Sequence, residues 1–262
     1  MKEAFTTIVT HRFAIVLLSA ALYAQAQQTE VAAPRFAAAS LKANTSIHNG
    51  MGNKFDPGMA RWTNTPLQNL IEGAYRLRDY QVVGGPNWLR SDKWDIDAKT
   101  DGPTTFTQKF QMLRTLIVER FGLKFHREIK DIPGYVLAIA KNGPKLHEVK
   151  EGEVSSIPAG TTIQSGLIIG HQVHMMDWVS LFASVLGCPF EDNTGLTGKY
   201  DFKLEWLPDE SQPNSGSETP ADPNRPSIFA ALQEQLGLKL EVKKFSVEMF
   251  VIDHVDRAPT AN

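Results

Sequence analysis

A five-residue step occurs twice in this chain and sets strong limits on its architecture. Phe121-Gly122-Leu123-Lys124-Phe125 and Leu236-Gly237-Leu238-Lys239-Leu240 each end a helical pattern and begin a strand-like run. Glycine suits such a helix end because it adopts the left-handed conformation without a Cβ clash. Two copies of one helix-to-strand step predict that the chain is built from two similar units.

Three further blocks recur in the same order in the two halves of the sequence. They pair Leu67-x-x-Leu70-Ile71 with Trp178-x-x-Leu181-Phe182, Lys93-Trp94-Asp95-Ile96 with Lys199-Tyr200-Asp201-Phe202, and Tyr135-Val136-Leu137-Ala138-Ile139 with Glu248-Met249-Phe250-Val251-Ile252. We therefore predict an α+β fold of two duplicated strand-helix-strand-strand-helix-strand-strand units, with helices packed on small mixed sheets. The units are expected at residues 35–141 and 166–256, joined by a connector at 142–165.

Hydrophobic periodicity and turn residues place the individual elements. Helices are predicted at residues 64–75, 107–121, 176–186 and 226–236. Strands are predicted at residues 35–41, 59–63, 80–83, 93–99, 123–129, 134–140, 167–173, 199–206, 238–243 and 247–254. Residues 208–225 are rich in Pro, Asp, Ser, Asn and Gly, and we expect them to form a flexible exposed loop.

Residues 1–26 have the pattern of a secretory signal peptide. Basic residues precede the apolar run Phe13–Leu22, and Ala24-Gln25-Ala26 offers a cleavage site before Gln27. A membrane anchor is the alternative, but the apolar run has about ten residues, whereas about 20 are needed to span a bilayer. We expect a mature exported protein, periplasmic or extracellular, with no transmembrane segment after cleavage.

The charge and cysteine content exclude several classes of protein. The 27 basic and 29 acidic residues nearly cancel, so no overall field attracts nucleic acid, and none is expected as a partner. Cys188 is the only cysteine, so the chain forms no intramolecular disulfide and the fold depends on its core. Its apolar neighbours favour a buried structural thiol over a nucleophile.

Few residues suggest catalysis. The Gly84-Gly85 pair runs into a proline rather than a helix, so it is not a phosphate loop. Asp95 and Asp97 share one face of a predicted strand, as a metal or acid/base pair would. The alternative is a solvated strand face beside neighbouring lysines.

The histidines do not complete a recognisable site. His171 and His174 would converge only on a helix, and no cysteine or carboxylate is spaced to complete a zinc site with them. Asp253 and His254 are adjacent on a predicted strand, so they should point apart. Neither Gly-x-Ser-x-Gly nor Ser-x-x-Lys occurs. We therefore predict no catalytic residue, no metal ligand and no cofactor.

Two tryptophans are candidates for a binding surface. Trp62 and Trp88 stand near turns, where an aromatic ring can face a partner, although packing in the core is the alternative. Trp94, Trp178 and Trp206 have the spacing of core or edge residues.

Several motifs of the mature chain also identify relatives. They are Gly84-Gly85-Pro86-Asn87-Trp88, Phe121-Gly122-Leu123-Lys124-Phe125-His126-Arg127-Glu128, Asp192-Asn193-Thr194-Gly195-Leu196-Thr197-Gly198-Lys199-Tyr200-Asp201, Ala231-Leu232-Gln233-Glu234-Gln235-Leu236-Gly237-Leu238-Lys239-Leu240 and Val251-Ile252-Asp253-His254-Val255. With them the chain resembles a large family of exported proteins of unknown function, abundant in soil bacteria. Some relatives join such a region to a membrane metallopeptidase of the antibiotic-sensor type, which implies a sensory role. The His-Glu-x-x-His motif of such a peptidase does not occur in this chain.

The order of elements suggests a second resemblance. Each half is similar to the short N-terminal domains of secretins and TonB-dependent receptors, in which two helices pack with small sheets. Those domains bind other envelope proteins, and the resemblance implies a similar role here.

We expect a non-catalytic binding or interaction module of the cell envelope, whose partner is an envelope protein or a small ligand. One alternative is a hydrolase of an envelope or extracellular polymer, with Asp95 and Asp97 or His171 and His174 in a groove between the halves. Another is a sensor for cell-wall-active compounds. Polar groups converging in a deep pocket would favour the hydrolase, whereas an exposed sheet edge or apolar patch would favour the binding module.

Overall fold

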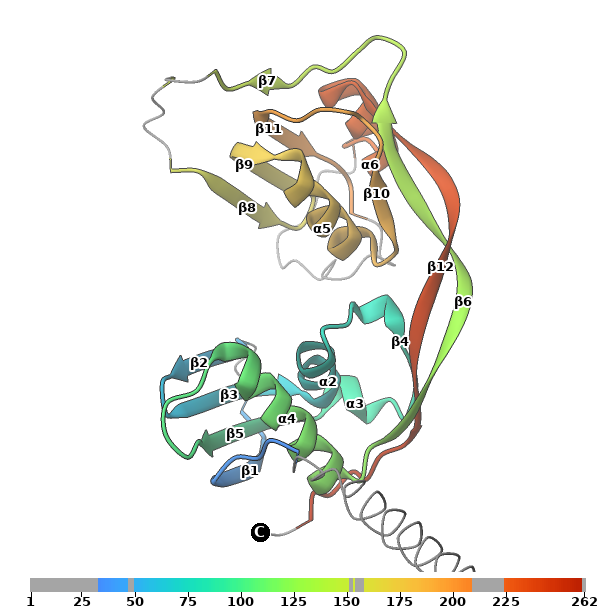
Figure 1. Cartoon of the computed structure of the whole chain (residues 1–262). Coiled ribbons are helices and arrows are strands. Elements are labelled where there is room, and N and C mark those ends of the chain that lie inside the picture. The colour runs from blue at the N-terminus through green and yellow to red at the C-terminus, as the bar shows by residue number, and fades with distance from the viewer. Residues whose placement is uncertain (1–32, 47–49, 151–152, 154–157, 209–223, 261–262) are drawn as a thin grey trace, which may run out of the picture.

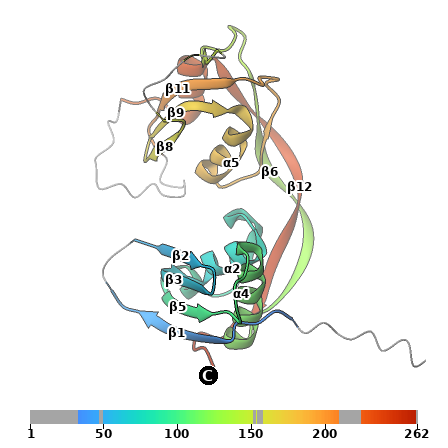
Figure 2. The ribbon, with the colours of Figure 1, turned by 60° about the vertical axis from the view of Figure 1, so that its left-hand side comes forward.

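Two lobes lie at opposite ends of a long two-stranded ribbon (Figures 1 and 2). The computed structural model describes residues 33–46, 50–150, 153, 158–208 and 224–260. The described residues form five α-helices and 12 strands, and the strands make three small sheets. This confirms the predicted α+β class. The predicted signal peptide lies outside the described residues, as does most of the predicted loop at 208–225.

The first lobe is an antiparallel sheet with helices packed on it. Its strands lie in the order β1 (Ala38–Asn44), β5 (Lys93–Lys99), β3 (Met59–Pro66) and β2 (Gly52–Asp56). Its helical elements are α2 (Leu67–Tyr75), the 3-10 turn η1 (Asp79–Gln81), α3 (Trp88–Ser91) and α4 (Phe106–Phe121). The short helix α3 was not predicted from the sequence.

Helix α4 shows how the local sequence produces its element. The Thr105 side chain accepts a hydrogen bond from the Gln108 N–H, and the Gln108 side chain accepts one from the Thr105 N–H, which caps the start. Leu113 and Ile117 lie on its buried face. Gly122 then adopts φ 56°, and this left-handed residue ends the helix where the sequence predicts.

The second lobe has a similar plan. Its sheet has the order β7 (His147–Glu148), β11 (Lys199–Glu205), β9 (Leu167–His174) and β8 (Gly160–Gln164). Helix α5 (Met175–Leu186) and helix α6 (Ile228–Ala231), which continues as the π-helical turn η2 (Leu232–Leu236), complete it. The expected connector at 142–165 thus contributes β7 and β8. Both strands are exposed, so they lack the apolar alternation that reveals a half-buried strand.

The ribbon consists of β6 (Lys124–Ile139) and β12 (Leu238–His254), paired antiparallel along almost their whole length. The sequence predicts two strands in each of these segments, and the structure has one. Pro133 and Gly134 suggested a break, but Pro133 continues the pairing opposite Lys244. A strand accommodates a proline where its outer side has no partner, and among the described strands only β12 lies beside β6 at this point.

The ribbon links the lobes by exchanging strands between them. The three-residue strand β4 (Val82–Gly84) of the first lobe runs parallel to the end of β12, and β10 (Phe190–Asp192) of the second lobe runs parallel to the end of β6. Phe250 and Ile252 from β12 lie in the core of the first lobe, whereas Leu137 from β6 lies in the core of the second. Each core is therefore completed by a strand from the other half of the chain.

The sheets of the two lobes have the same strand order. Strands β1, β5, β3 and β2 of the first lobe correspond to β7, β11, β9 and β8 of the second. The strand pairing changes the alignment of the block that begins at Tyr135. Strand β10 first pairs at Tyr135 and β4 at Phe250, so Tyr135 corresponds to Phe250 rather than to Glu248. Descent of both lobes from one duplicated unit stays a prediction.

Candidate functional site

The two tryptophans proposed for a binding surface pack with the first lobe. Trp62 is 2% exposed, and its ring makes edge contacts with Phe55 and Phe110 at centroid distances of 5.4 and 6.1 Å. The structure thus places Trp62 in the core, because the inward side of β3 faces α4. Trp88 begins α3 and is partly buried against the same core.

Asp95 and Asp97 lie two residues apart on β5, but each is bound to a different partner. Asp95 Oδ1 accepts hydrogen bonds from the Asn64 N–H and the Asn44 side-chain amide, both at 2.8 Å. Asp97 forms an ion pair with Arg61. Both carboxylates therefore have structural partners and do not converge on a shared site.

The histidine pair is separated by a bulge in β9. His171 and Gln172 together lie opposite the single residue Asp201 of β11, and Gln172 has a φ of 51°. His174 is the last residue of β9, immediately before α5. Among the described residues, no group of three or more His, Cys, Asp or Glu side chains is placed to hold a metal ion.

Two histidine–aspartate pairs lie at the end of the ribbon. His126 Nδ1 lies 2.9 Å from Asp253 Oδ1, and His254 Nε2 lies 3.1 Å from Asp256 Oδ1. Asp253 and His254 thus bind different neighbours, as their alternation on a strand implies. Both pairs are about half exposed, where such pairs contribute little stability.

Cys188 follows α5 and is half-buried. Burial, assisted by the Asp79 carboxylate of the other lobe, raises the pKa of its thiol to about 11. The thiolate is the nucleophilic form, so this environment suits a structural thiol. Near this point Arg78 Nη2 donates to Ser180 Oγ at 3.1 Å, which joins the two lobes directly.

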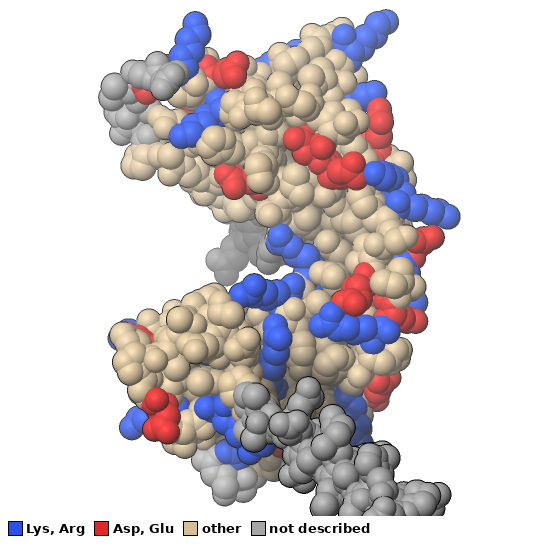
Figure 3. Space-filling view, in the orientation of Figure 1, with Lys and Arg blue, Asp and Glu red and all other residues tan. Residues whose placement is uncertain are grey.

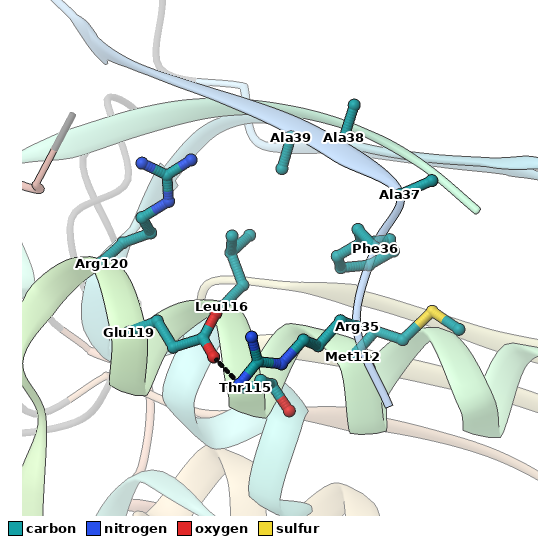
Figure 4. Close-up of a pocket in the computed structure, with 10 residues that line it drawn as sticks. All are labelled: Arg35, Phe36, Ala37, Ala38, Ala39, Met112, Thr115, Leu116, Glu119 and Arg120. Carbon is teal, nitrogen blue, oxygen red and sulfur yellow. Dashed lines mark ion pairs between the residues drawn. The ribbon is translucent and has the colours of Figure 1, made fainter. Parts of the chain in front are cut away.

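One surface pocket, the β1–α4 pocket, lies between β1 and α4 and has a volume of about 420 Å³ (Figure 4). The first strand and the helix border it from opposite sides, with Arg120 at one end. It is lined by Arg35, Phe36, Ala37, Ala38, Ala39, Met112, Thr115, Leu116, Glu119 and Arg120. None of these residues was predicted as a site residue, because two segments far apart in the sequence form the pocket.

A second surface pocket, the tail pocket, has a volume of about 610 Å³. It is lined by Leu41, Ala43, Asn44, Thr45, Ser91, Asp92, Lys93, Trp94, Arg257, Ala258 and Pro259. At its rim, Arg257 donates to Asp92 at 2.8 and 3.3 Å, and this hydrogen bonding lowers the pKa of the Asp92 carboxyl. The buried indole N–H of Trp94 has no hydrogen-bond partner in the described part of the chain.

Charged side chains of both signs cover the ribbon. In the space-filling view they are intermixed along the ribbon side, while a hollow separates the lobes on the opposite side (Figure 3). Many are paired, as in the ion pairs of Arg127 with Glu248 and of Lys243 with Glu191. Charges on a free strand edge discourage another strand from pairing there.

The open edge of the second lobe differs from the ribbon. Strand β8 is the last strand of its sheet, and among the described strands β9 is its only neighbour. All five of its residues, Gly-Thr-Thr-Ile-Gln, are exposed, and none is charged or proline. Ile163 is 56% exposed. The edge therefore combines backbone groups that pair with no other described strand and an accessible apolar side chain.

Fold and surface together define a two-lobed α+β protein in which β8 forms an uncharged, five-residue sheet edge and surface pockets lie on the first lobe. Over residues 68–255, the chain matches the family model described as protein of unknown function (DUF3738). This chain belongs to that family. The match confirms the predicted membership of a family of unknown function. Export, association with soil bacteria and likeness to secretin domains stay predictions.

Two further comparisons, with curated proteins and with solved structures, give no match. Within the described residues, the helices are all too short or too polar to cross a membrane.

Proposed function

We propose that this protein is an exported, non-catalytic interaction module that binds an extended segment of another envelope protein at the edge of β8. The observation that supports this role is the uncharged, fully exposed edge described above. A free strand edge offers a row of backbone donors and acceptors to which a partner strand adds.

The other sheet edges carry features that oppose such pairing. Strand β2 contains Lys54 and Asp56, and β1 contains Lys42. Strands β4 and β10 have three residues each, and β7 has two. Charge and short length are common protections of an edge, so β8 is the edge best suited to receive a strand.

The chemistry of β8 also describes its partner. Backbone hydrogen bonds would supply most of the affinity, and side chains on alternate positions would supply specificity. Thr161 and Ile163 share one face of β8, and Thr162 lies on the other. A matching segment is extended, uncharged and rich in β-branched residues, with an apolar side chain beside Ile163.

The polar residues considered for a hydrolase do not converge. Asp95 and Asp97 each bind a separate neighbour, and His171 and His174 belong to one strand interrupted by a bulge. The structure therefore offers more support for binding than for hydrolysis.

The experiment is photo-crosslinking in the source cell from position 162, with position 53 on β2 as the matched control. We expect a photoreactive residue replacing Thr162 to capture one discrete partner, and the same residue replacing Asn53 to capture none. Thr162→Lys should abolish co-purification of that partner, because a charged side chain on an edge strand opposes the addition of another strand. Asn53→Lys should leave it intact.

Two results would contradict the proposal. One is equal retention of the partner by the Thr162→Lys and wild-type proteins. The other is crosslinking from position 53 as strong as that from position 162. Circular dichroism of each variant confirms that the fold is retained.

A further inference from the structure

The β1–α4 pocket has an apolar interior held in place by the core. In Figure 4, Leu116 from α4, Ala39 from β1 and Phe36 border the same space. Leu116 is buried, and the Phe36 ring meets the core ring of Trp62 edge-on at a centroid distance of 6.3 Å. Because these side chains are anchored in the lobe, they present a preformed apolar surface.

Arg120 places a cation at one end of this space. Its Nη1 donates to the carbonyl oxygen of Thr260 at 2.8 Å, and the Thr260 N–H donates to the Arg120 carbonyl at 2.8 Å. A guanidinium has five N–H donors, and the others make no hydrogen bond to the described part of the chain. Arg120 is therefore held in one orientation with donors left for a ligand.

The charges around the pocket leave one positive charge uncompensated. Glu119 would repel an anion, but its carboxylate is 2.7 Å from Arg35 Nη2 and is neutralised by that pair. Arg120 forms no ion pair with any described residue. A planar guanidinium matches a carboxylate in charge and in hydrogen-bonding geometry.

We infer that the β1–α4 pocket binds a small amphipathic organic acid. Its carboxylate would accept hydrogen bonds from Arg120, and its apolar body would cover Leu116 and Phe36. The volume of about 420 Å³ falls within the range of about 300–1,000 Å³ that is typical of small-molecule sites. The pocket lies in the first lobe and β8 in the second, so this inference does not depend on the proposed strand binding.

Binding is tested with three eight-carbon probes whose head groups are negative, neutral and positive: octanoate, octanol and octylammonium. The methyl resonance of Met112, which lines the pocket, reports occupancy by NMR during titration of the whole mature chain. We expect octanoate to bind about tenfold more tightly than octanol, because a charge-assisted hydrogen bond adds to the shared apolar contact. Octylammonium should bind more weakly than octanol.

Substitutions in the pocket distinguish the contribution of its charge to binding from the contribution of its shape. Arg120→Gln should weaken octanoate about tenfold while leaving octanol unchanged, and a purely structural role of Arg120 would affect both probes equally. Ala39→Leu should block both probes, because Ala39 faces the pocket in Figure 4. Ser40→Leu is the matched control, since Ser40 follows Ala39 on β1 and does not line the pocket. Thermal unfolding of each variant checks its fold.

Three outcomes would overturn the inference. The first is no shift of the Met112 resonance with octanoate at millimolar concentration, and the second is equal binding of octanoate and octanol. The third is much tighter binding of an apolar tripeptide with a free carboxylate, which would assign the site to a protein C-terminus. Failure of β8 crosslinking would leave all these measurements unaffected, so the two proposals fail separately.

Discussion

Asp95 and Asp201 perform the same structural task in the two lobes. Asp201 Oδ1 accepts a hydrogen bond of 2.7 Å from the Gln172 N–H, as Asp95 does from Asn64. Asn64 and Gln172 have φ values of 54° and 51°, in the left-handed region that few residues other than glycine adopt. In both lobes the aspartate lies opposite a two-residue bulge and satisfies its backbone.

We expect Asp95→Ala and Asp201→Ala each to lower the free energy of unfolding by about 1–3 kcal/mol, because a partly buried N–H loses its acceptor. Asp97→Ala is the control. It removes an exposed ion pair with Arg61, which is worth about 0–1 kcal/mol. Urea denaturation gives the free energies, and hydrogen exchange of the Asn64 and Gln172 amides localises the effect. An equal loss in all three variants would contradict this role.

The equivalence of Asp95 and Asp201 was visible in the sequence, but their structural role was not. The sequence aligned Lys93-Trp94-Asp95-Ile96 with Lys199-Tyr200-Asp201-Phe202 and so identified equivalent positions. It left open a chemical role for Asp95 or a place on a solvated strand face, whereas in the structure Asp95 accepts a hydrogen bond from the backbone N–H of Asn64. A bulge in a neighbouring strand causes the difference, and no pattern within β5 itself reveals that bulge.

At the scale of elements, Gly122 and Gly237 end helical segments with similar left-handed backbones, φ 56° and 65°. Their surroundings differ. A Cβ on Gly122 would meet the Asp256 carboxylate, which is the free end of a side chain, whereas a Cβ on Gly237 would meet the backbone oxygen of Gly143. Lys145 donates its N–H to the Leu236 carbonyl at 2.8 Å, so the chain around Gly143 is tied to the helix end.

Gly237→Ala should therefore destabilise the protein more than Gly122→Ala. Gly195→Ala is the control for backbone strain alone, since Gly195 has φ 69° and no atom near its Cβ position. We expect that control to cost about 1–2 kcal/mol, Gly122→Ala to cost slightly more, and Gly237→Ala to exceed both. Thermal and urea unfolding measure the order. If Gly237→Ala and Gly195→Ala lower the free energy of unfolding equally, the contact with the Gly143 backbone oxygen has no effect on stability.

Strands β6 and β12 were each predicted as two shorter strands. The two strands expected within β6 were joined by a connection at residues 130–133. In the structure the two long strands supply each other's hydrogen bonds through this region. The pairing partner lies about a hundred residues away in sequence, so local signals could not decide between a turn and a continuous strand.

At the scale of the whole molecule, the exchange of ribbon strands makes the lobes interdependent. The first lobe buries Phe250 and Ile252 from the second half of the chain, and the second lobe buries Leu137 from the first half. The fold is thus two lobes in space, although neither predicted unit contains a complete core.

We expect residues 27–141 and 142–262, produced separately, to lack cooperative unfolding, because each would expose the apolar surface that the other half normally covers. Mixing them should restore the near-ultraviolet circular dichroism of the intact chain and give a one-to-one complex by size-exclusion chromatography with light scattering. The intact chain is the control. A cooperative unfolding transition in either half alone would show that the exchanged strands are dispensable.

The sequence alone determined the α+β class and the helix ends at Gly122 and Gly237, because these depend on local backbone preference and hydrophobic spacing. Only the tertiary structure decided that the ribbon strands are continuous and that Trp62 is buried. It also decided that β8 forms an open edge and that Arg120 closes a pocket beside β1. Each of these features depends on contacts between distant segments, and such contacts leave no periodic pattern in either segment.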